Sequence, residues 1–155
     1  MGEVETLKGL LGRVQATRGP DHQIDADLYA VQEGWDGAAF CQNGEVHRLK
    51  LKSREGNRRT YEGEDGQGID SHELPMFTGS LDYATEMVGR TLPDACLQID
   101  VGAHRDGRRI CMAFILLGDH DLGACWGAAT APLAICAALL SALIAQAEQG
   151  APHGE

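Results

Sequence analysis

The longest run of uncharged residues lies near the C-terminal end of the chain, at 122–147. From Thr130 onward this run predicts a helix, because Thr130 suits an N-cap, Pro132 falls in the first turn, and Ala and Leu favour helix. Apolar residues surround the helix axis, which is typical of a helix buried in a protein core or in a membrane. The part after Pro132 is shorter than the roughly 20 residues that span a bilayer, and no Lys or Arg follows it. We therefore expect a core helix and no membrane contact.

Helical spacing also marks the beginning of the chain. Residues 5–17 place apolar side chains on one face, and residues 24–31 repeat this pattern after Asp21, a suitable N-cap. Gly19-Pro20 separates the two patterns. They predict an N-terminal helical hairpin. A further helix is expected at about 81–89, after Ser80 or Thr78 as its cap.

Strict alternation of apolar and polar residues appears at 97–104, and an apolar run follows at 110–117. The turn residues Asp106-Gly107 stand between them, so the pattern predicts a β-hairpin. The second run is apolar at every position from 110 to 117. That composition predicts a central strand covered on both faces.

The middle of the chain is less regular. Segments 38–41 and 45–52 predict two strands joined across Asn43-Gly44, a strong hairpin-turn signal. Residues 53–72 are polar and rich in glycine, so we expect a mobile surface loop there.

Together these elements predict an α+β fold. It would be a layered α/β sandwich with an antiparallel sheet, an N-terminal helical hairpin and a buried C-terminal helix. The 155 residues are enough to bury a core, and we expect a single domain over 1–150 and a disordered tail at 151–155. Trp126 is expected in that core, with its indole N–H bonded to a loop carbonyl.

Charge and cysteine content narrow the function classes. Asp and Glu number 23 against 13 Lys and Arg, a net charge of −10, which argues against binding to polymeric nucleic acid. The five cysteines stand far apart without a CxxC pair, and the first residues contain no apolar signal region. We expect a reduced protein in the cytoplasm.

Motifs of catalysis are sparse. The sequence contains no GxSxG, P-loop or GxGxxG motif. Asp119-His120-Asp121, together with His104, offers metal-ligand side chains, but the spacing suits an ordinary turn better than a zinc motif. We therefore expect no enzyme activity, no cofactor and no metal site, and we keep a metal-dependent hydrolase as one alternative.

Basic residues gather in two clusters. The first basic cluster consists of Lys50, Lys52, Arg54, Arg58 and Arg59, and the second consists of Arg105, Arg108 and Arg109. Arginine side chains match phosphate oxygens, and several that converge can bind an anionic small molecule. With Tyr61 and His104, these residues form the candidate ligand-binding set. The alternative is that the cations cover solvated strand edges and turns, where they discourage aggregation.

Three stretches of the chain together resemble a known family. They are Gly19-Pro20-Asp21 with Asp25-Ala26, Phe77-Thr78-Gly79-Ser80-Leu81-Asp82-Tyr83-Ala84, and Ala128-Ala129-Thr130-Ala131-Pro132-Leu133-Ala134. In this order they are similar to the phage ABA (α-β-α) sandwich domain family of small phage and prophage proteins, over roughly residues 7–146 without the middle segment. The resemblance implies the layered fold and expression of a phage gene in a bacterial host. It brings no catalytic or ligand residues with it.

These expectations combine into one functional hypothesis. The chain would be a non-enzymatic phage accessory protein, a cytoplasmic homo-oligomer that binds and sequesters an anionic small molecule such as a nucleotide second messenger of host defence. The first alternative is a protein-binding inhibitor of a host enzyme or nucleic-acid-binding protein. A membrane-bound lysis protein is a further alternative, which the expected core helix disfavours.

Overall fold

The computed structural model describes the backbone of residues 3–34, 37–42, 45–55, 58–63 and 75–150, and the side chains of 3–34 and 75–150. The chain divides into two compact units, and each is described by itself. The larger unit comprises Met1–Pro20 and Phe77–Glu155, and the smaller unit comprises Asp21–Met76. Because this division does not show whether either unit folds alone, a single domain over 1–150 stays a prediction.

The larger unit contains a three-stranded antiparallel sheet. Its strands are β4 (Cys96–Ala103), β5 (Arg109–Leu117) and β6 (His120–Ala128), and β5 lies in the centre. β4 and β5 form the hairpin that the alternation predicts. β6 is not among the predicted strands, because its sequence HDLGACWGA contains two glycines and no regular alternation. It occupies the first half of the uncharged run and places Asp121 on a strand.

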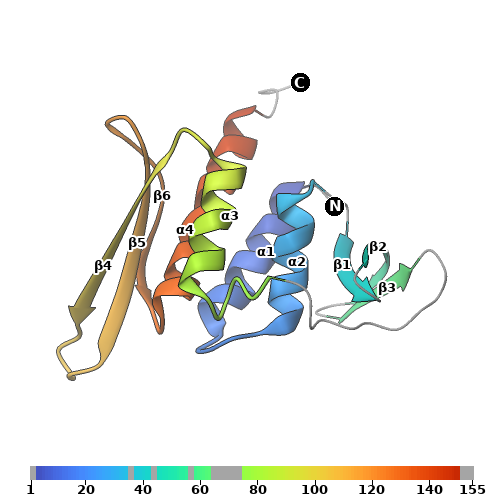
Figure 1. Cartoon of the computed structure of the whole chain (residues 1–155), viewed down its shortest axis with the longest axis horizontal. Coiled ribbons are helices and arrows are strands. Elements are labelled where there is room, and N and C mark those ends of the chain that lie inside the picture. The colour runs from blue at the N-terminus through green and yellow to red at the C-terminus, as the bar shows by residue number, and fades with distance from the viewer. Residues whose placement is uncertain (1–2, 35–36, 43–44, 56–57, 64–74, 151–155) are drawn as a thin grey trace. The chain divides into compact units, whose positions relative to one another are not determined.

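Three helices of the larger unit lie on one side of this sheet, namely α1 (Glu3–Ala16), α3 (Leu81–Thr91) and α4 (Ala131–Gly150) (Figure 1). α4 packs on β5 and β6, while α1 and α3 pack against α4. Ten residues of α4 between Leu133 and Ile144 are buried. The α+β class, with a buried C-terminal helix on an antiparallel sheet, is therefore confirmed.

The helix starts follow the expected caps. At α3, the Ser80 Oγ accepts a hydrogen bond from the Tyr83 backbone N–H at 3.3 Å. At α4, the Thr130 Oγ1 accepts from the Leu133 N–H at 3.4 Å. Both side chains satisfy an amide that has no partner within the helix, which explains why each helix begins where it does.

The two faces of the sheet differ in their cover. Cys111, Ala113 and Ile115 of β5 are buried toward α4, and we call this side the inner face. Met112 and Phe114 point to the opposite side, the outer face, and are half-buried. Figure 1 shows the helices of this unit on the inner side alone. The prediction that β5 is covered on both faces is therefore wrong within the described part of this unit.

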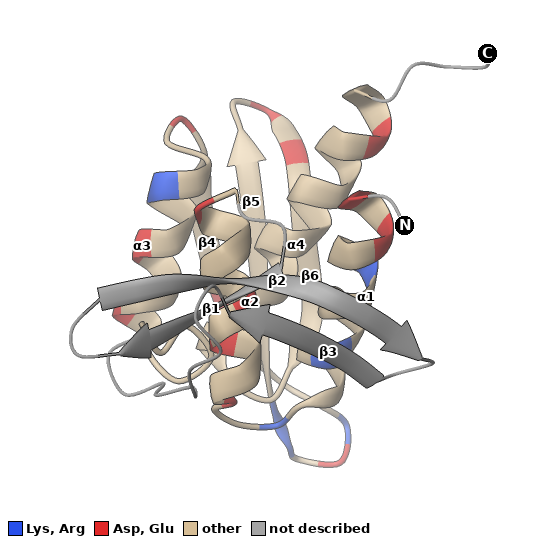
Figure 2. Ribbon diagram, turned by 90° about the vertical axis from the view of Figure 1, so that its right-hand side faces the viewer, with Lys and Arg blue, Asp and Glu red and all other residues tan. Residues whose placement is uncertain are grey.

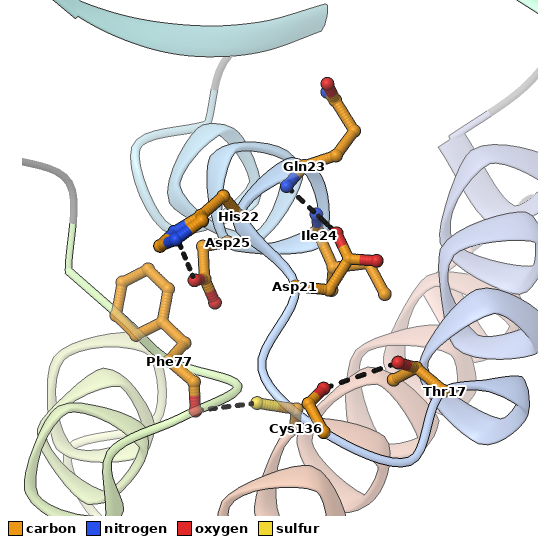
Figure 3. Close-up of polar contacts among 9 residues, drawn as sticks. Thr17, Asp21, His22, Gln23, Ile24, Asp25, Phe77 and Cys136 are labelled. Atoms are coloured by element: carbon orange, nitrogen blue, oxygen red, sulfur yellow. Dashed lines mark hydrogen bonds and ion pairs between the residues drawn. The ribbon is translucent and has the colours of Figure 1, made fainter. Parts of the chain in front are cut away.

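The smaller unit begins with α2 (His22–Gln32), followed by β1 (Gly37–Gln42), β2 (Glu45–Glu55) and β3 (Arg58–Gly63). Asp21 caps α2, because its Oδ1 accepts from the backbone N–H groups of Gln23 and Ile24 at 2.9 and 3.0 Å (Figure 3). The strands form an antiparallel sheet in the order β1-β2-β3, and α2 contacts β1. Both helices of the predicted N-terminal hairpin are thus present.

The expected surface loop at 53–72 is partly replaced by strand. Residues 53–55 belong to β2 and residues 58–63 to β3, with Leu51 paired to Tyr61 and Arg54 to Arg59. The loop prediction is wrong at these positions, because backbone pairing between strands outweighs their polar composition. Residues 56–57 and 64–72 of that loop, the turn at 43–44 and the predicted tail at 151–155 lie outside the described residues.

Candidate functional site

The β4–β5 turn is organised around the carboxylate of Asp106. This carboxylate accepts hydrogen bonds from the Arg108 backbone N–H at 3.0 Å and from the Arg108 Nε at 2.6 Å. The Nδ1 of His104 lies 3.3 Å from the same carboxylate. The turn itself closes through the His104 N–H, which donates to the Arg108 carbonyl at 2.8 Å, and through Gly107, whose φ of +85° favours glycine.

These contacts stabilise the charged form of Asp106. The Arg108 backbone N–H is the main cause, and the Arg108 and His104 side chains add to it, so the pKa of Asp106 lies below its ordinary value of 3.8. Asp106 thereby fixes the position of the Arg108 guanidinium, which stays 66% exposed to solvent. The predicted ligand residue Arg108 is therefore held by a neighbouring anion and still accessible.

The second basic cluster is divided between the two faces of the sheet. The pairing of β4 with β5 is continuous, from Cys96 opposite Leu116 to Ala103 opposite Arg109. Residues that pair in this way have side chains on the same face of the sheet. Arg109, opposite Ala103, alternates along β5 so that it lies on the same side as the inner-face residues. By the same alternation, His104 and Arg108, which lie opposite each other at the turn, belong to the outer face. Of the predicted set, His104 and Arg108 are thus brought together, whereas Arg109 lies on the other side and Arg105 is exposed in the turn.

The turn is visible at the lower end of Figure 2, where its basic positions are blue and its acidic position is red. With histidine neutral, residues 104–109 contain three arginines and one aspartate, a formal charge of +2. This local charge is opposite in sign to the net charge of −10 of the whole chain. The turn is therefore a local concentration of positive charge in an acidic protein.

Trp126 on β6 adds an aromatic surface to the outer face. Its side chain is 72% exposed, and its ring meets that of Phe114 edge-on, with centroids 5.0 Å apart and an interplanar angle of 79°. The prediction that Trp126 lies in the core is wrong. Its neighbour Cys125, paired beside Ala113, points inward, and alternation along the strand turns Trp126 outward.

Sequence reasoning missed Trp126 as a candidate site residue. The sequence HDLGACWGA has no regular alternation that would place residue 126 outward, and only the folded strand, with Cys125 buried, turns Trp126 to the outer face. Met112 lies on the same face, with its Cε close to Gly102 of β4. The outer face thus carries an exposed indole, a half-buried methionine and phenylalanine, and the His104–Asp106–Arg108 turn at one end.

The first basic cluster lies in the smaller unit. Lys50, Lys52 and Arg54 are on β2, and Arg58 and Arg59 are on β3 together with Tyr61. The backbone register sets Arg54 opposite Arg59 and Lys50 opposite Glu62. The side chains of this cluster lie outside the described part of the structure, so its role as a binding site stays a prediction.

The other candidate residues for catalysis or metal binding lie at the start of β6 and on α2. Within 3–34 and 75–150, where side chains are described, no group of three or more His, Cys, Asp or Glu is arranged to hold a metal ion. Asp119, His120 and Asp121 are exposed at the start of β6. Asp25, in the first turn of α2, is buried with its Oδ2 3.8 Å from the Nδ1 of His22 (Figure 3).

Three of the four cysteines of the larger unit are core residues. Cys111, Cys125 and Cys136 are buried thiols outside any disulfide, and Cys96 is exposed. Burial raises the pKa of Cys125, which keeps it a neutral thiol at physiological pH. The Cys136 thiol donates to the Phe77 carbonyl at 3.5 Å (Figure 3). None of these three has the exposed, electropositive surroundings of a nucleophile.

Comparison with known proteins adds no assignment to this geometry: the chain matches no family model, no curated protein and no solved structure.

Proposed function

We propose that the protein is a non-enzymatic binding protein whose ligand is an anionic, aromatic small molecule such as a nucleotide. The observation that carries this proposal is the exposure of Trp126 on the same face of the sheet as Arg108. An indole open to solvent is a stacking surface for a nucleobase, and an arginine fork matches phosphate oxygens.

The geometry of the outer face suits such a two-part ligand. Trp126 is on β6, which neighbours β5, at the register irregularity beside Met112, and Arg108 precedes Met112 by four residues, just before β5 begins. At roughly 3.3 Å per residue, the base-stacking and phosphate-binding groups are about 13 Å apart along the strand. Arg105, exposed in the same turn, supplies a further cation. A phosphate would replace the Asp106 carboxylate as the partner of the Arg108 guanidinium.

The wider setting of the proposal comes from the sequence. Similarity to phage ABA sandwich proteins supports a phage or prophage origin and action in the bacterial cytoplasm. The acidic net charge supports a small anion over a polymeric nucleic acid as the ligand. The biological role that we propose for such a binder is sequestration of a nucleotide second messenger.

A thermal-shift screen against cyclic and linear nucleotides tests the proposal. A ligand that binds only the native state stabilises it and so raises the melting temperature. At a ligand concentration of one hundred times the Kd, the stabilisation is about 2.7 kcal/mol. We expect Trp126→Ala and Arg108→Ala to abolish the shift. Arg109→Ala is the matched control, because it removes a cation of the same cluster from the opposite face.

Two outcomes contradict this proposal, and two further measurements separate it from its rivals. The absence of a shift with every nucleotide contradicts it, and so does a shift that both Trp126→Ala and Arg108→Ala retain in full. Lys50→Ala, tested alongside, reports whether the first basic cluster takes part. Recovery of the intact nucleotide after denaturation of the complex distinguishes binding from hydrolysis.

A protein partner is the second candidate, and the breadth of the outer face favours it. Beyond the turn, this face is apolar along β5 and joins the exposed Trp126; its β5 residues are Ile110, Met112, Phe114 and Leu116. Exposed apolar surface centred on tryptophan is typical of protein interfaces. If a purified host protein binds the wild type and loses at least tenfold in affinity with Trp126→Ala, while no nucleotide shifts the melting temperature, this second function replaces the first.

A further inference from the structure

Within the described residues of the larger unit no strand pairs with the outer edge of β4, and this edge has the features of a strand that pairs with a copy of itself. β4 is an edge strand of the sheet of the larger unit, and its eight residues pair with β5 without a break in register. The other edge, β6, has two register irregularities against β5. Bulges protect an edge from further pairing, and β4 has none.

The turn hydrogen bond shows which backbone groups of β4 are free. His104 and Arg108 form a hydrogen-bonded pair, since the His104 N–H donates to the Arg108 carbonyl. In an antiparallel ladder such pairs alternate with non-bonded pairs, so the bonded residues of β4 are those at 102, 100 and 98. Leu97, Ile99 and Val101 therefore direct their N–H and C=O groups away from β5, toward the open edge.

The same three residues have apolar side chains that the larger unit covers incompletely. They lie on the inner face, because they pair with Ile115, Ala113 and Cys111. α4 packs mainly on β5 and β6, so Leu97 and Ile99 stay half-buried and Val101 is 62% exposed. The strand lacks Lys, Arg and Pro, residues that commonly blunt an exposed edge.

We propose that β4 binds β4 of a second copy of this chain, antiparallel and centred on Ile99, so that the two sheets become one of six strands. This register sets Leu97 opposite Val101 of the partner and Ile99 opposite its own copy. By symmetry Val101 also lies opposite Leu97 of the partner, which makes three pairs. Each is a hydrogen-bonded pair, and the inner-face side chains of each pair cover one another. The proposal is independent of the ligand proposed above.

The polar residues of β4 favour this register over one centred on Asp100. Gln98 and Asp100 lie on the outer face, and within one copy the Gln98 Nε2 donates to the Asp100 Oδ2 at 3.2 Å. Centred on Ile99, the pairing sets Gln98 of each copy opposite Asp100 of the other, so the same amide–carboxylate bond forms between chains. Centred on Asp100, it would set two carboxylates directly opposite each other, which is destabilising.

Light scattering after size-exclusion chromatography of the full chain, over a range of micromolar concentrations, tests the pairing. We expect a dimer for the wild type and association at least about tenfold weaker for Val101→Lys, which places a charge at the edge. Leu117→Lys is the matched control, because Leu117 is an exposed apolar residue on β5 and not on the edge. A monomeric wild type, or a Val101→Lys variant that dimerises as the wild type does, overturns the proposal.

A cross-linking test checks the register and does not depend on the folding of Val101→Lys. In a Cys96→Ser background, Gln98→Cys and Asp100→Cys variants are prepared separately and then mixed under mild oxidation. We expect a disulfide-linked dimer mainly in the mixture, because only positions 98 and 100 of different copies lie opposite each other. Equal cross-linking of either variant alone, or none in the mixture, overturns the register.

Discussion

Gly123 is a residue at which β6 lies very close to the backbone of α4. A Cβ at this position would clash with the Ala138 carbonyl oxygen, the Ala142 backbone nitrogen at 2.5 Å and the Ala142 Cβ at 2.8 Å. Two of these atoms belong to the helix backbone and cannot turn aside. The glycine is thus required by packing, and its φ is not in the left-handed region.

From this contact we predict that Gly123→Ala destabilises the protein by about 1–3 kcal/mol, the range expected for overpacking. Chemical denaturation monitored by circular dichroism measures the change. Gly127→Ala on the same strand is the control, since a Cβ there meets no atom within 4 Å. Equal stability of the two variants would show that α4 can move away from the sheet at no cost.

Asp106 gives the β4–β5 turn a pH dependence. Its folded-state pKa is lowered, chiefly by the Arg108 backbone N–H, so its contribution to stability is present above the ordinary value of 3.8 and is lost as pH falls through the folded value. We predict a carboxyl titration midpoint below 3.8 in the native protein, measured by NMR. Arg108→Ala should raise that midpoint only in part, because the backbone donor remains.

Arg109→Ala is the control for this titration, since Arg109 is not among the groups that lower the Asp106 pKa. It should leave the midpoint unchanged. If Arg108→Ala returned the midpoint fully to the ordinary value, the guanidinium and not the backbone N–H would be the principal partner of Asp106.

At the scale of elements, α4 is the one that holds the larger unit together. It contacts α1 and α3 as well as β5 and β6, and this explains why its apolar residues surround the axis. An ion pair of 2.7 Å between Lys8 and Glu148 also joins α1 to the last turns of α4, but both side chains are half exposed. Exposed pairs contribute little, so packing carries the stability of this arrangement.

We therefore predict that Leu139→Ala, in the buried part of α4, lowers the free energy of unfolding by about 2–5 kcal/mol. Leu81→Ala on α3 serves as the control, because Leu81 is an exposed leucine near a helix start. Urea denaturation of both variants gives the comparison. A loss at Leu139 no larger than that at Leu81 would mean that the α4 interface is loosely packed.

For the whole molecule, the alternative to a core position of α4 is that this helix enters a membrane. By length and composition its 20 residues could cross one, but 56% of the apolar window is buried within the protein. The same helix completes the core, so insertion into lipid would remove it from β5 and β6. We expect the chain, expressed without detergent, to remain in the supernatant after ultracentrifugation, and recovery in the membrane pellet would contradict the core position of α4.

The candidate site was only partly predictable from the sequence. His104 and Arg108 were identified as basic or polar residues near a turn, and the structure places them on one face around Asp106. Trp126 was assigned to the core because tryptophan is usually buried and its segment has few polar residues. Its exposure depends on the face of the sheet to which residue 126 turns, and the irregular sequence of β6 does not reveal that face.

Local sequence determined most of the helices and strands of this protein. Caps at Asp21, Ser80 and Thr130 and apolar spacing specify α2, α3 and α4, because these interactions join residues within one or two turns of the chain. Strict alternation specified β4 for the same reason. Tertiary structure alone decided that β6 and β3 are strands, that α4 covers only one face of β5, and that Trp126 is exposed. Strand pairing and solvent cover depend on partners distant in the sequence, and no local pattern encodes which partner covers which face.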